Sequence, residues 1–335
     1  MTKPTIVDIA RHAGVSIGTV SNALNNKGRV AEKTRKKVIA SAEALGFVRD
    51  YNAARLKSGK SNLIGVIVED ITNPYMSELT VSMETVLGRN GYLPILANSS
   101  DKLERQSQLI EEMIGHGVAG IVLIPCAGTS SKEVDLIVSR KIPCVTTTRE
   151  LPEALFDFVG TDDYFGAQDV VGHLLDEGCR TLVQIGGLEN TSTGRLRREG
   201  FFAAHAARGM VANKDLVFPG GACREFGYET AKMLLGLNLT YDGIVCQNDI
   251  VAAGVYMAYA EAGKRIGDDV RLVGFDCLME TAVWDPPLTT VRGNPVAIGH
   301  DVAMLLLRRL EGDTSQVRRF RLTPELIIRR SSTGR

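Results

Sequence analysis

Short polar segments that follow apolar runs are the part of this 335-residue sequence best suited to binding a small molecule. Asp and Asn side chains accept from and donate to vicinal hydroxyls, and Arg presents a planar fork to a hydroxyl or a carboxylate. In open α/β sheets, ligands bind beyond the carboxyl ends of the strands, where these segments fall. The segments are 69–75, Thr148-Arg149, 186–197, Asn248-Asp249 and Asp276. Together they suit a sugar, a sugar acid or a similar polar metabolite.

Local structural roles compete with ligand binding at several of these positions. Asp276 could instead cap a helix or turn, and Asn248-Asp249 could cap the helix that follows. The arginines around Arg197 could all be surface charges, but their spacing points them in different directions. Trp284 could stack on a ligand, although core packing is favoured for it.

The elements that position these segments are alternating strands and helices. Short, β-branched apolar runs are typical of parallel strands buried on both faces, so the pattern predicts a doubly wound α/β fold. We expect one lobe from about 63 to 161, a second from about 162 to 290, and a return of 291–330 to the first, with a cleft between the lobes. The predicted strands are 63–68, 94–98, 120–125, 143–148, 181–186, 243–247 and 270–275, and the predicted helices include 76–89, 104–116, 164–177, 195–208 and 251–263.

The first 25 residues carry the features of two short helices joined by a tight turn. Thr5 and Asp8 have the spacing of a capping box, Gly14 suits a turn, and Ser16 is a good cap for the second helix. On that helix Val20 and Leu24 face inward, which leaves short polar residues outside, where they could approach base edges. The pattern predicts a helix-turn-helix in residues 1–47. A helical hairpin that merely caps a larger domain is the alternative.

The charge distribution favours a polyanionic partner for the N-terminal region. The chain has no net charge, but residues 1–60 hold 12 Lys and Arg against 4 Asp and Glu, and the remainder holds 27 against 35. A basic head on an acidic body indicates nucleic-acid binding by the head.

A third helix is expected from about Glu32 to Leu45, followed by a linker over 48–62. Basic residues crowd the start of this helix, where they could contact phosphates or simply form a solvated face. Ala31 stands at its cap position and offers no side-chain acceptor. Gly46 is expected to end the helix and Phe47 to pack back into the three-helix core. The linker's Ser, Gly and Lys content indicates a mobile connection with a possible short helix over 51–57.

Several functional classes have no support in the residues. The six cysteines are scattered, so we expect reduced core residues and neither a disulfide framework nor a metal site. The sequence has no apolar signal region and no 18-residue apolar stretch, which favours a soluble, cytoplasmic protein. Phosphate-loop, metalloprotease and nucleophile-elbow motifs are missing, so no enzyme activity and no cofactor are expected.

Residues 5–25, TIVDIARHAGVSIGTVSNALN, resemble the N-terminal signature of the LacI/GalR family of bacterial transcriptional regulators. The resemblance implies that residues 61–330 form a two-lobed core similar to periplasmic sugar-binding proteins. It also implies a hinge helix in the linker that forms on operator DNA, with Leu56 wedged into the minor groove. The linker departs from the family at Arg49-Asp50 and Ala54, so Leu56 could alternatively serve in packing, and the role of Arg55 is open. We expect DNA contacts at Thr5, Ser16, Ile17, Gly18, Thr19, Ser21, Asn22, Asn25, Arg29, Thr34, Arg55 and Leu56.

The same resemblance selects residues within the polar segments. Tyr75 lies in an N-P-Y segment, Arg197 in R-L-R-R-E-G-F, Asn248 in an N-D pair and Asp276 in G-F-D. Thr148, beside Arg149, stands where relatives commonly have Asp. The resemblance therefore implies effector binding at Tyr75, Thr148, Arg149, Arg197, Asn248 and Asp276.

The sequence thus predicts a DNA-binding regulator, more readily a repressor than an activator, controlled by a sugar-like effector. Reading a near-palindromic operator requires two heads, so a homodimer is expected. A solute-binding or receptor protein of the periplasmic type is the main alternative, and a sugar-modifying enzyme is a third.

Overall fold

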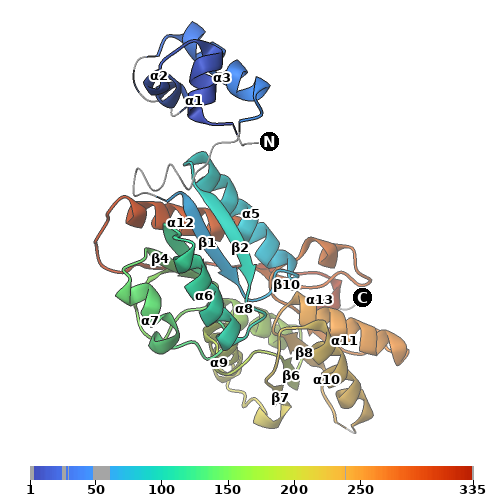
Figure 1. The fold of residues 1–335 in the computed structure, drawn as a ribbon. Helices are drawn as coiled ribbons and strands as arrows, with labels where there is room; N and C mark the ends of the chain where they lie inside the picture. Colours follow the sequence, from blue (N-terminus) through green and yellow to red (C-terminus); the bar gives the residue numbers. More distant parts are fainter. Residues whose placement is uncertain (1–3, 25–27, 29, 48–60, 238, 334–335) are drawn as a thin grey trace. The chain divides into compact units, whose positions relative to one another are not determined.

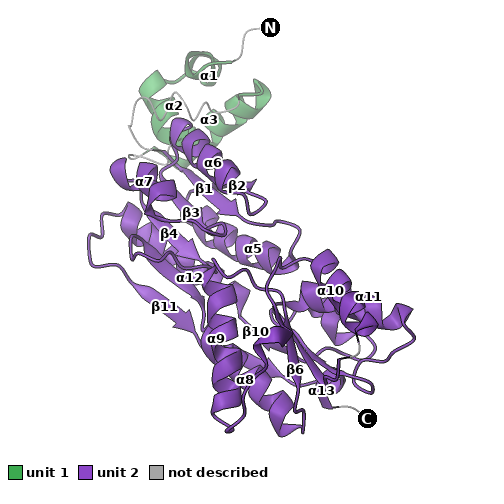
Figure 2. Ribbon diagram, turned by 90° about the horizontal axis from the view of Figure 1, so that it is seen from below, with its two compact units in different colours: residues 1–60 green, residues 61–335 purple. Residues whose placement is uncertain are grey.

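The computed structural model describes residues 4–24, 28, 30–47, 61–237 and 239–333. The chain forms two compact units, residues 1–60 and residues 61–335 (Figure 2). Within its described part, the first unit contains three helices: α1 (Ile6–Ala13), α2 (Ile17–Leu24) and α3 (Glu32–Ala44).

Local hydrogen bonds explain where the first two helices begin. Thr5 Oγ1 accepts from the Asp8 N–H at 3.4 Å, and Asp8 Oδ2 accepts from the Thr5 N–H at 2.9 Å, so the predicted capping box is confirmed. Gly14 adopts a φ of 61°, a conformation that suits glycine, and turns the chain toward α2. Ser16 Oγ then accepts from the Thr19 N–H at 3.1 Å. These contacts set the angle between α1 and α2.

A small apolar core holds the three helices together. Ile9, Val20 and Val38 are fully buried in it, and Phe47 packs against it after α3 ends. Helix α3 begins at Ala31 with no side-chain cap, as the sequence predicts. Arg35, one of the basic residues clustered at the start of α3, donates from Nη1 to the Ala23 carbonyl at 3.0 Å. This bond connects α3 to α2.

The second unit contains two parallel sheets, each belonging to one lobe (Figure 1). The first sheet has the order β11-β5-β4-β3-β1-β2 and the second the order β7-β6-β8-β9. The first-lobe strands are β1 (Leu63–Val68), β2 (Leu93–Asn98), β3 (Gly120–Leu123), β4 (Cys144–Thr147), β5 (Asp157–Thr161) and β11 (Arg319–Leu322). The second-lobe strands are β6 (Leu182–Ile185), β7 (Val217–Phe218), β8 (Gly243–Cys246) and β9 (Arg271–Val273).

Helices complete both lobes. The first lobe has α5 (Pro74–Arg89), α6 (Leu103–Gly115), α7 (Ser131–Ser139) and α12 (Pro295–Leu310). The second lobe has α8 (Asp163–Asp176), α9 (Ser192–Ala206), α10 (Arg224–Gly236) and α11 (Asp249–Glu261), with short 3-10 helices η1 (Lys214–Leu216) and η2 (Met279–Ala282).

Helix α12 packs directly on α5 although the two are more than 200 residues apart. A Cβ at Gly299 would lie 2.5 Å from the Leu79 carbonyl oxygen, so only glycine permits this close approach. Leu79, Ile298 and Val302 are fully buried in the shared core of the first lobe. The return of the chain to the first lobe is thereby fixed by packing.

After β11 the chain crosses once more, to the second lobe. The sequence-based assignment of 291–330 to the first lobe does not include this crossing. Strand β12 (Glu325–Ile327) pairs antiparallel with β10 (Thr290–Arg292). The terminal helix α13 (Arg330–Thr333) packs against β9, and Ser331 Oγ donates to the Leu272 carbonyl at 2.6 Å. Residues after β11 therefore belong with the second lobe.

Candidate functional site

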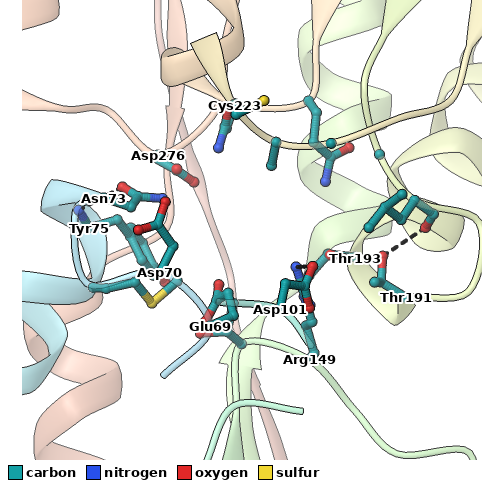
Figure 3. A pocket seen from close by; sticks show the side chains of 18 of the residues that line it. Glu69, Asp70, Asn73, Tyr75, Asp101, Arg149, Thr191, Thr193, Cys223 and Asp276 are labelled. Carbon is teal, nitrogen blue, oxygen red and sulfur yellow. Dashed lines mark hydrogen bonds and ion pairs between the residues drawn. The ribbon is translucent and has the colours of Figure 1, made fainter. Parts of the chain in front are cut away.

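A cavity of about 400 Å³ lies between the lobes, at the carboxyl ends of the strands (Figure 3). Its lining includes five carboxylates and two guanidinium groups. The first lobe contributes Glu69, Asp70, Asn73, Tyr75, Asp101 and Arg149, among others, and the second lobe contributes Asp163, Thr191, Arg197, Gln247, Asn248 and Asp276.

On the first-lobe side, Arg149 is buried and held by its own lobe. Its Nη1 donates to Asp101 Oδ1 at 2.6 Å and to the Pro125 carbonyl at 3.2 Å, and its Nη2 donates to Asp101 Oδ2 at 3.3 Å. The preceding residue, Thr148, has a φ of 62°, and its buried Oγ1 has no hydrogen-bond partner among the described residues. The turn after β4 thus aims both side chains at the cavity.

Glu69, at the end of β1, is a buried acid beside this pair. Only 8% of the residue is exposed, and its Oε2 has no hydrogen-bond partner in the described part of the chain. Burial raises the pKa of Glu69, an effect that the nearby Arg149 opposes. The carboxyl group is therefore an available acceptor in the cavity wall.

On the second-lobe side, Arg197 connects three elements. Its Nε donates to Asp163 Oδ1 at 2.7 Å, and its Nη1 donates to the Gln247 carbonyl. Its guanidinium group lies over the Phe275 ring, 3.5 Å from the centroid, and Nη2 is 4.0 Å from Asp276 Oδ1. Arg197 is thus a cleft residue, and the alternative of a surface charge is wrong for it.

Asp276 lies at the centre of the second-lobe wall with a φ of 111°, an unusual backbone conformation for a non-glycine residue. Burial raises the pKa of Asp276 to about 7, although Arg197 favours its charged form. The side chain of Asn73 in the first lobe also favours the charged form of Asp276.

Asn248 and Tyr75 contribute from the starts of two helices. Asn248 Oδ1 accepts from the Val251 N–H at 2.9 Å, so its predicted capping role is confirmed while the residue also lines the cavity. Tyr75 is 5% exposed, and burial raises the pKa of its hydroxyl. Thr161, at the end of β5, also lines the cavity.

The lobes also contact each other beside the cavity. The Glu150 N–H in the first lobe donates to Ser192 Oγ in the second at 2.8 Å. The Gly128 N–H donates to the Asn190 carbonyl at 3.1 Å. These bonds hold the lobes together around the enclosed space.

All six residues expected to bind a small molecule line this one cavity: Tyr75, Thr148, Arg149, Arg197, Asn248 and Asp276. The sequence analysis did not identify Asp101 and Asp163. Asp101 lies three residues after β2 and Asp163 two residues after β5, so recognition of every strand end would have found them. Trp284 is not among the lining residues. It packs edge-on against Tyr256, with 5.0 Å between the ring centroids, as the favoured alternative predicts.

The cysteines are only partly as predicted. All six are free, and Cys126, Cys144, Cys179 and Cys246 are buried. Cys223 is exposed and lines the cavity, and Cys277 is half-buried, so the expectation of core positions is wrong for these two. Both lie in loops next to the cleft, where the backbone turns toward solvent.

Helix α2 presents a separate candidate surface. Ser16, Ile17, Gly18 and Asn22 are exposed, and Thr19 and Ser21 are half-buried. Ile17 is 52% exposed, so it does not belong to the buried face of the helix. Among the other candidates, Thr5 is exposed and Thr34 half-buried, whereas Asn25, Arg29, Arg55 and Leu56 lie outside the described residues.

Within the described ranges, no group of three or more His, Cys, Asp and Glu side chains is placed to hold a metal ion. No helix among these residues has the length and apolar character needed to span a membrane.

A three-helix unit with helix-turn-helix geometry and a two-lobed α/β unit with a polar cleft define a DNA-binding regulator built on a ligand-binding core. The family model for bacterial regulatory proteins of the lacI family matches residues 5–50, and the model for a periplasmic binding protein-like domain matches residues 171–332. The HTH-type transcriptional repressor PurR of Photobacterium profundum is 30% identical over 98% of both chains. The chain belongs to the LacI family of transcriptional regulators.

Solved structures extend the similarity to the whole fold. The lac repressor dimer bound to operator and the anti-inducer ONPF gives a TM-score of 0.86 over 100% of both chains, at 21% identity. A LacI family regulator from Enterococcus faecium with bound ribose gives 0.72 at 28% identity, covering 81% of this chain and 98% of that one. The first match shares the head as well as the core.

Proposed function

We propose that this protein regulates transcription by binding a near-palindromic operator, and that a small sugar-like effector in the interlobe cleft controls its affinity for DNA. The cavity of about 400 Å³, lined by polar side chains of both lobes, carries the effector half of this proposal. A ligand that contacts both lobes stabilises one arrangement of the two lobes. Domain closure of this kind can carry the effect of ligand binding to a distant site. The bound ribose of the Enterococcus faecium regulator supports a sugar-like ligand.

For the DNA half, α2 is the proposed recognition helix. Its exposed Ile17 could contact a thymine methyl, and Asn22 could present a bidentate amide to adenine. The remaining candidate contacts in the head are Thr5, Ser16, Gly18, Thr19, Ser21, Asn25, Arg29 and Thr34. In the linker, Leu56 is proposed as a minor-groove wedge, with Arg55 beside it.

Several further features belong to the same proposal. The protein acts as a homodimer, because a palindromic site presents two equivalent half-sites to two heads. It acts in the cytoplasm, as a repressor and without enzymatic activity. The relatives that support these points include the PurR repressor and the operator-bound lac repressor dimer.

Selection of duplexes from a random library by the full-length chain, followed by anisotropy titrations, tests the proposal. We expect enrichment of a near-palindrome and a linear fall of log K with log salt concentration, because bound phosphates release counterions. The solute-binding alternative predicts no enriched duplex, so failure of the selection would overturn the regulatory function.

A further inference from the structure

The two arginines of the cleft are already bound to carboxylates of the protein. Arg149 makes a forked pair with Asp101 through both of its terminal nitrogens. Arg197 donates to Asp163 through Nε and to the Gln247 carbonyl through Nη1. Paired in this way, Arg149 offers no free fork for a carboxylate or phosphate of a ligand. Arg197 has only Nη2 without a hydrogen bond, and that nitrogen lies 4.0 Å from Asp276 Oδ1. The sequence-based expectation of an arginine fork for a ligand carboxylate therefore loses its basis.

The cavity is lined by more carboxyl groups than guanidinium groups. Glu69, Asp70 and Asp276 line it in addition to the two paired aspartates. Figure 3 shows Asp70 and Asp276 gathered near Asn73 on one side of the pocket, apart from the Asp101–Arg149 pair. An anionic group entering this space would lose its hydration without gaining a free cation, which is unfavourable.

Unpartnered acceptors in the wall point to what the ligand must supply. Glu69 Oε2 is buried and lacks a hydrogen-bond partner within the described residues. Independently, Gln247 Oε1 is also buried and unpartnered there, in a residue that is 6% exposed and lines the cavity. Buried acceptors are normally satisfied, so these two atoms favour a ligand that brings hydrogen-bond donors to this wall.

We propose that the cleft selects a ligand without negative charge that donates hydrogen bonds through hydroxyl or amino groups, and that it excludes sugar acids and sugar phosphates. This inference rests on the proposed effector site and narrows the class of effector. Burial raises the pKa of both Glu69 and Asp276, and donors from such a ligand would stabilise their charged forms.

A matched panel tests the charge preference in the full-length chain. The probes are ribose, glucose and galactose, the corresponding amino sugars, the corresponding sugar acids and the corresponding terminal phosphates. Thermal shift finds the binding members, and calorimetry gives their Kd. We expect a neutral or amino member to bind at least about tenfold more tightly than its acid and phosphate.

Two other outcomes of the panel would contradict either this inference or the proposed effector. An acid or phosphate that binds as tightly as its parent sugar overturns this inference and leaves the proposed effector site intact. If no member of any series binds, the sugar-like effector of the proposed function is overturned and the inference falls with it.

Two variants test whether the protein's own charges cause the exclusion. Asp101→Asn frees the Arg149 fork, so the sugar acid should gain about tenfold in affinity relative to its parent sugar. Glu69→Gln removes a negative charge at an unpartnered position, where loss of folding is not expected, and should also favour the acid. Asp135→Asn, on the exposed face of α7, is the matched control. Unchanged ratios of acid to parent sugar in both cleft variants would contradict the inference.

Discussion

The backbone N–H of Glu150 donates to Ser192 Oγ at 2.8 Å, and this bond joins the first lobe to the second beside the cleft. Ser192 is 8% exposed and opens helix α9, the helix that also carries Arg197. Any opening of the lobes at this edge must break the bond. The same helix therefore presents a cavity-lining side chain and joins the two lobes.

Replacing Ser192 with Ala should loosen this edge of the cleft. One hydrogen bond contributes roughly 0.5–1.5 kcal/mol, so opening should become roughly two- to tenfold more frequent. Hydrogen exchange of the peptide that contains Glu150 should accelerate by that factor. Ser139→Ala, at the exposed end of α7, is the control and should leave this peptide unchanged. Equal exchange in both variants would mean that the bond does not hold the lobes.

Stability should fall with rising pH because of Asp276. Burial raises the pKa of this carboxyl from 3.8 to about 7, so the folded chain binds its proton more tightly than the unfolded chain does. The resulting stabilisation is complete below about pH 4 and is lost as the pH rises through about 7.

Asp276→Asn removes this titration and should therefore gain stability relative to the parent between pH 5 and pH 8. The relative gain is on the order of a few kcal/mol in the free energy of unfolding, which urea titrations at the two pH values measure. Asp135→Asn provides the control for a carboxyl outside the cleft. Parallel pH profiles for parent and Asp276→Asn would show that the carboxyl titrates normally in the folded chain.

Asn22 provides the test of base recognition by α2. Its side chain is exposed on the helix, and a bidentate amide discriminates adenine from other bases. Asn22→Ala should cost about 1–3 kcal/mol in operator binding and relax the preference at one base pair. Anisotropy with a set of single-base operator variants measures both effects. A uniform loss on every duplex would instead identify a phosphate contact.

Leu56 tests the proposed hinge. As a minor-groove wedge it allows the duplex to bend and to make further contacts, so Leu56→Ala should weaken operator binding well beyond the loss of simple packing in a linker. Operator Kd values of parent and variant, compared on the same selected duplex, measure the effect. Parental affinity in the variant would rule out the wedge.

The sequence predicts the regular parts of the fold because their patterns are local. The capping box of Thr5 and Asp8 and the apolar run of β1 depend on residues close together in the chain. Strand β5 lacks such a pattern, since it begins with Asp157. That carboxylate is satisfied by Arg309 of α12, with Nε–Oδ2 and Nη2–Oδ1 distances of 2.7 and 2.8 Å. A partner 152 residues away leaves no local signal.

The candidate site also has features that the sequence predicts and features that it does not. Strand ends locate Arg149 and Asp276 at the cleft, because the edge of a parallel sheet gathers them. The sequence does not show that Asp101 and Asp163 neutralise the two arginines, since each pair joins separate segments and forms only in the folded chain. The position of a residue was predictable, and its charge environment was not.

We expect occupancy of the cleft to change the affinity of the protein for DNA. The operator Kd of the full-length chain, measured by anisotropy with and without a saturating ligand from the sugar panel, tests this directly. Coupling between sites is typically about 1–3 kcal/mol, so we expect a change of about 5- to 150-fold. Asp276→Ala should retain the ligand-free Kd and lose the response. An unchanged Kd for the parent chain at saturating ligand would contradict the account.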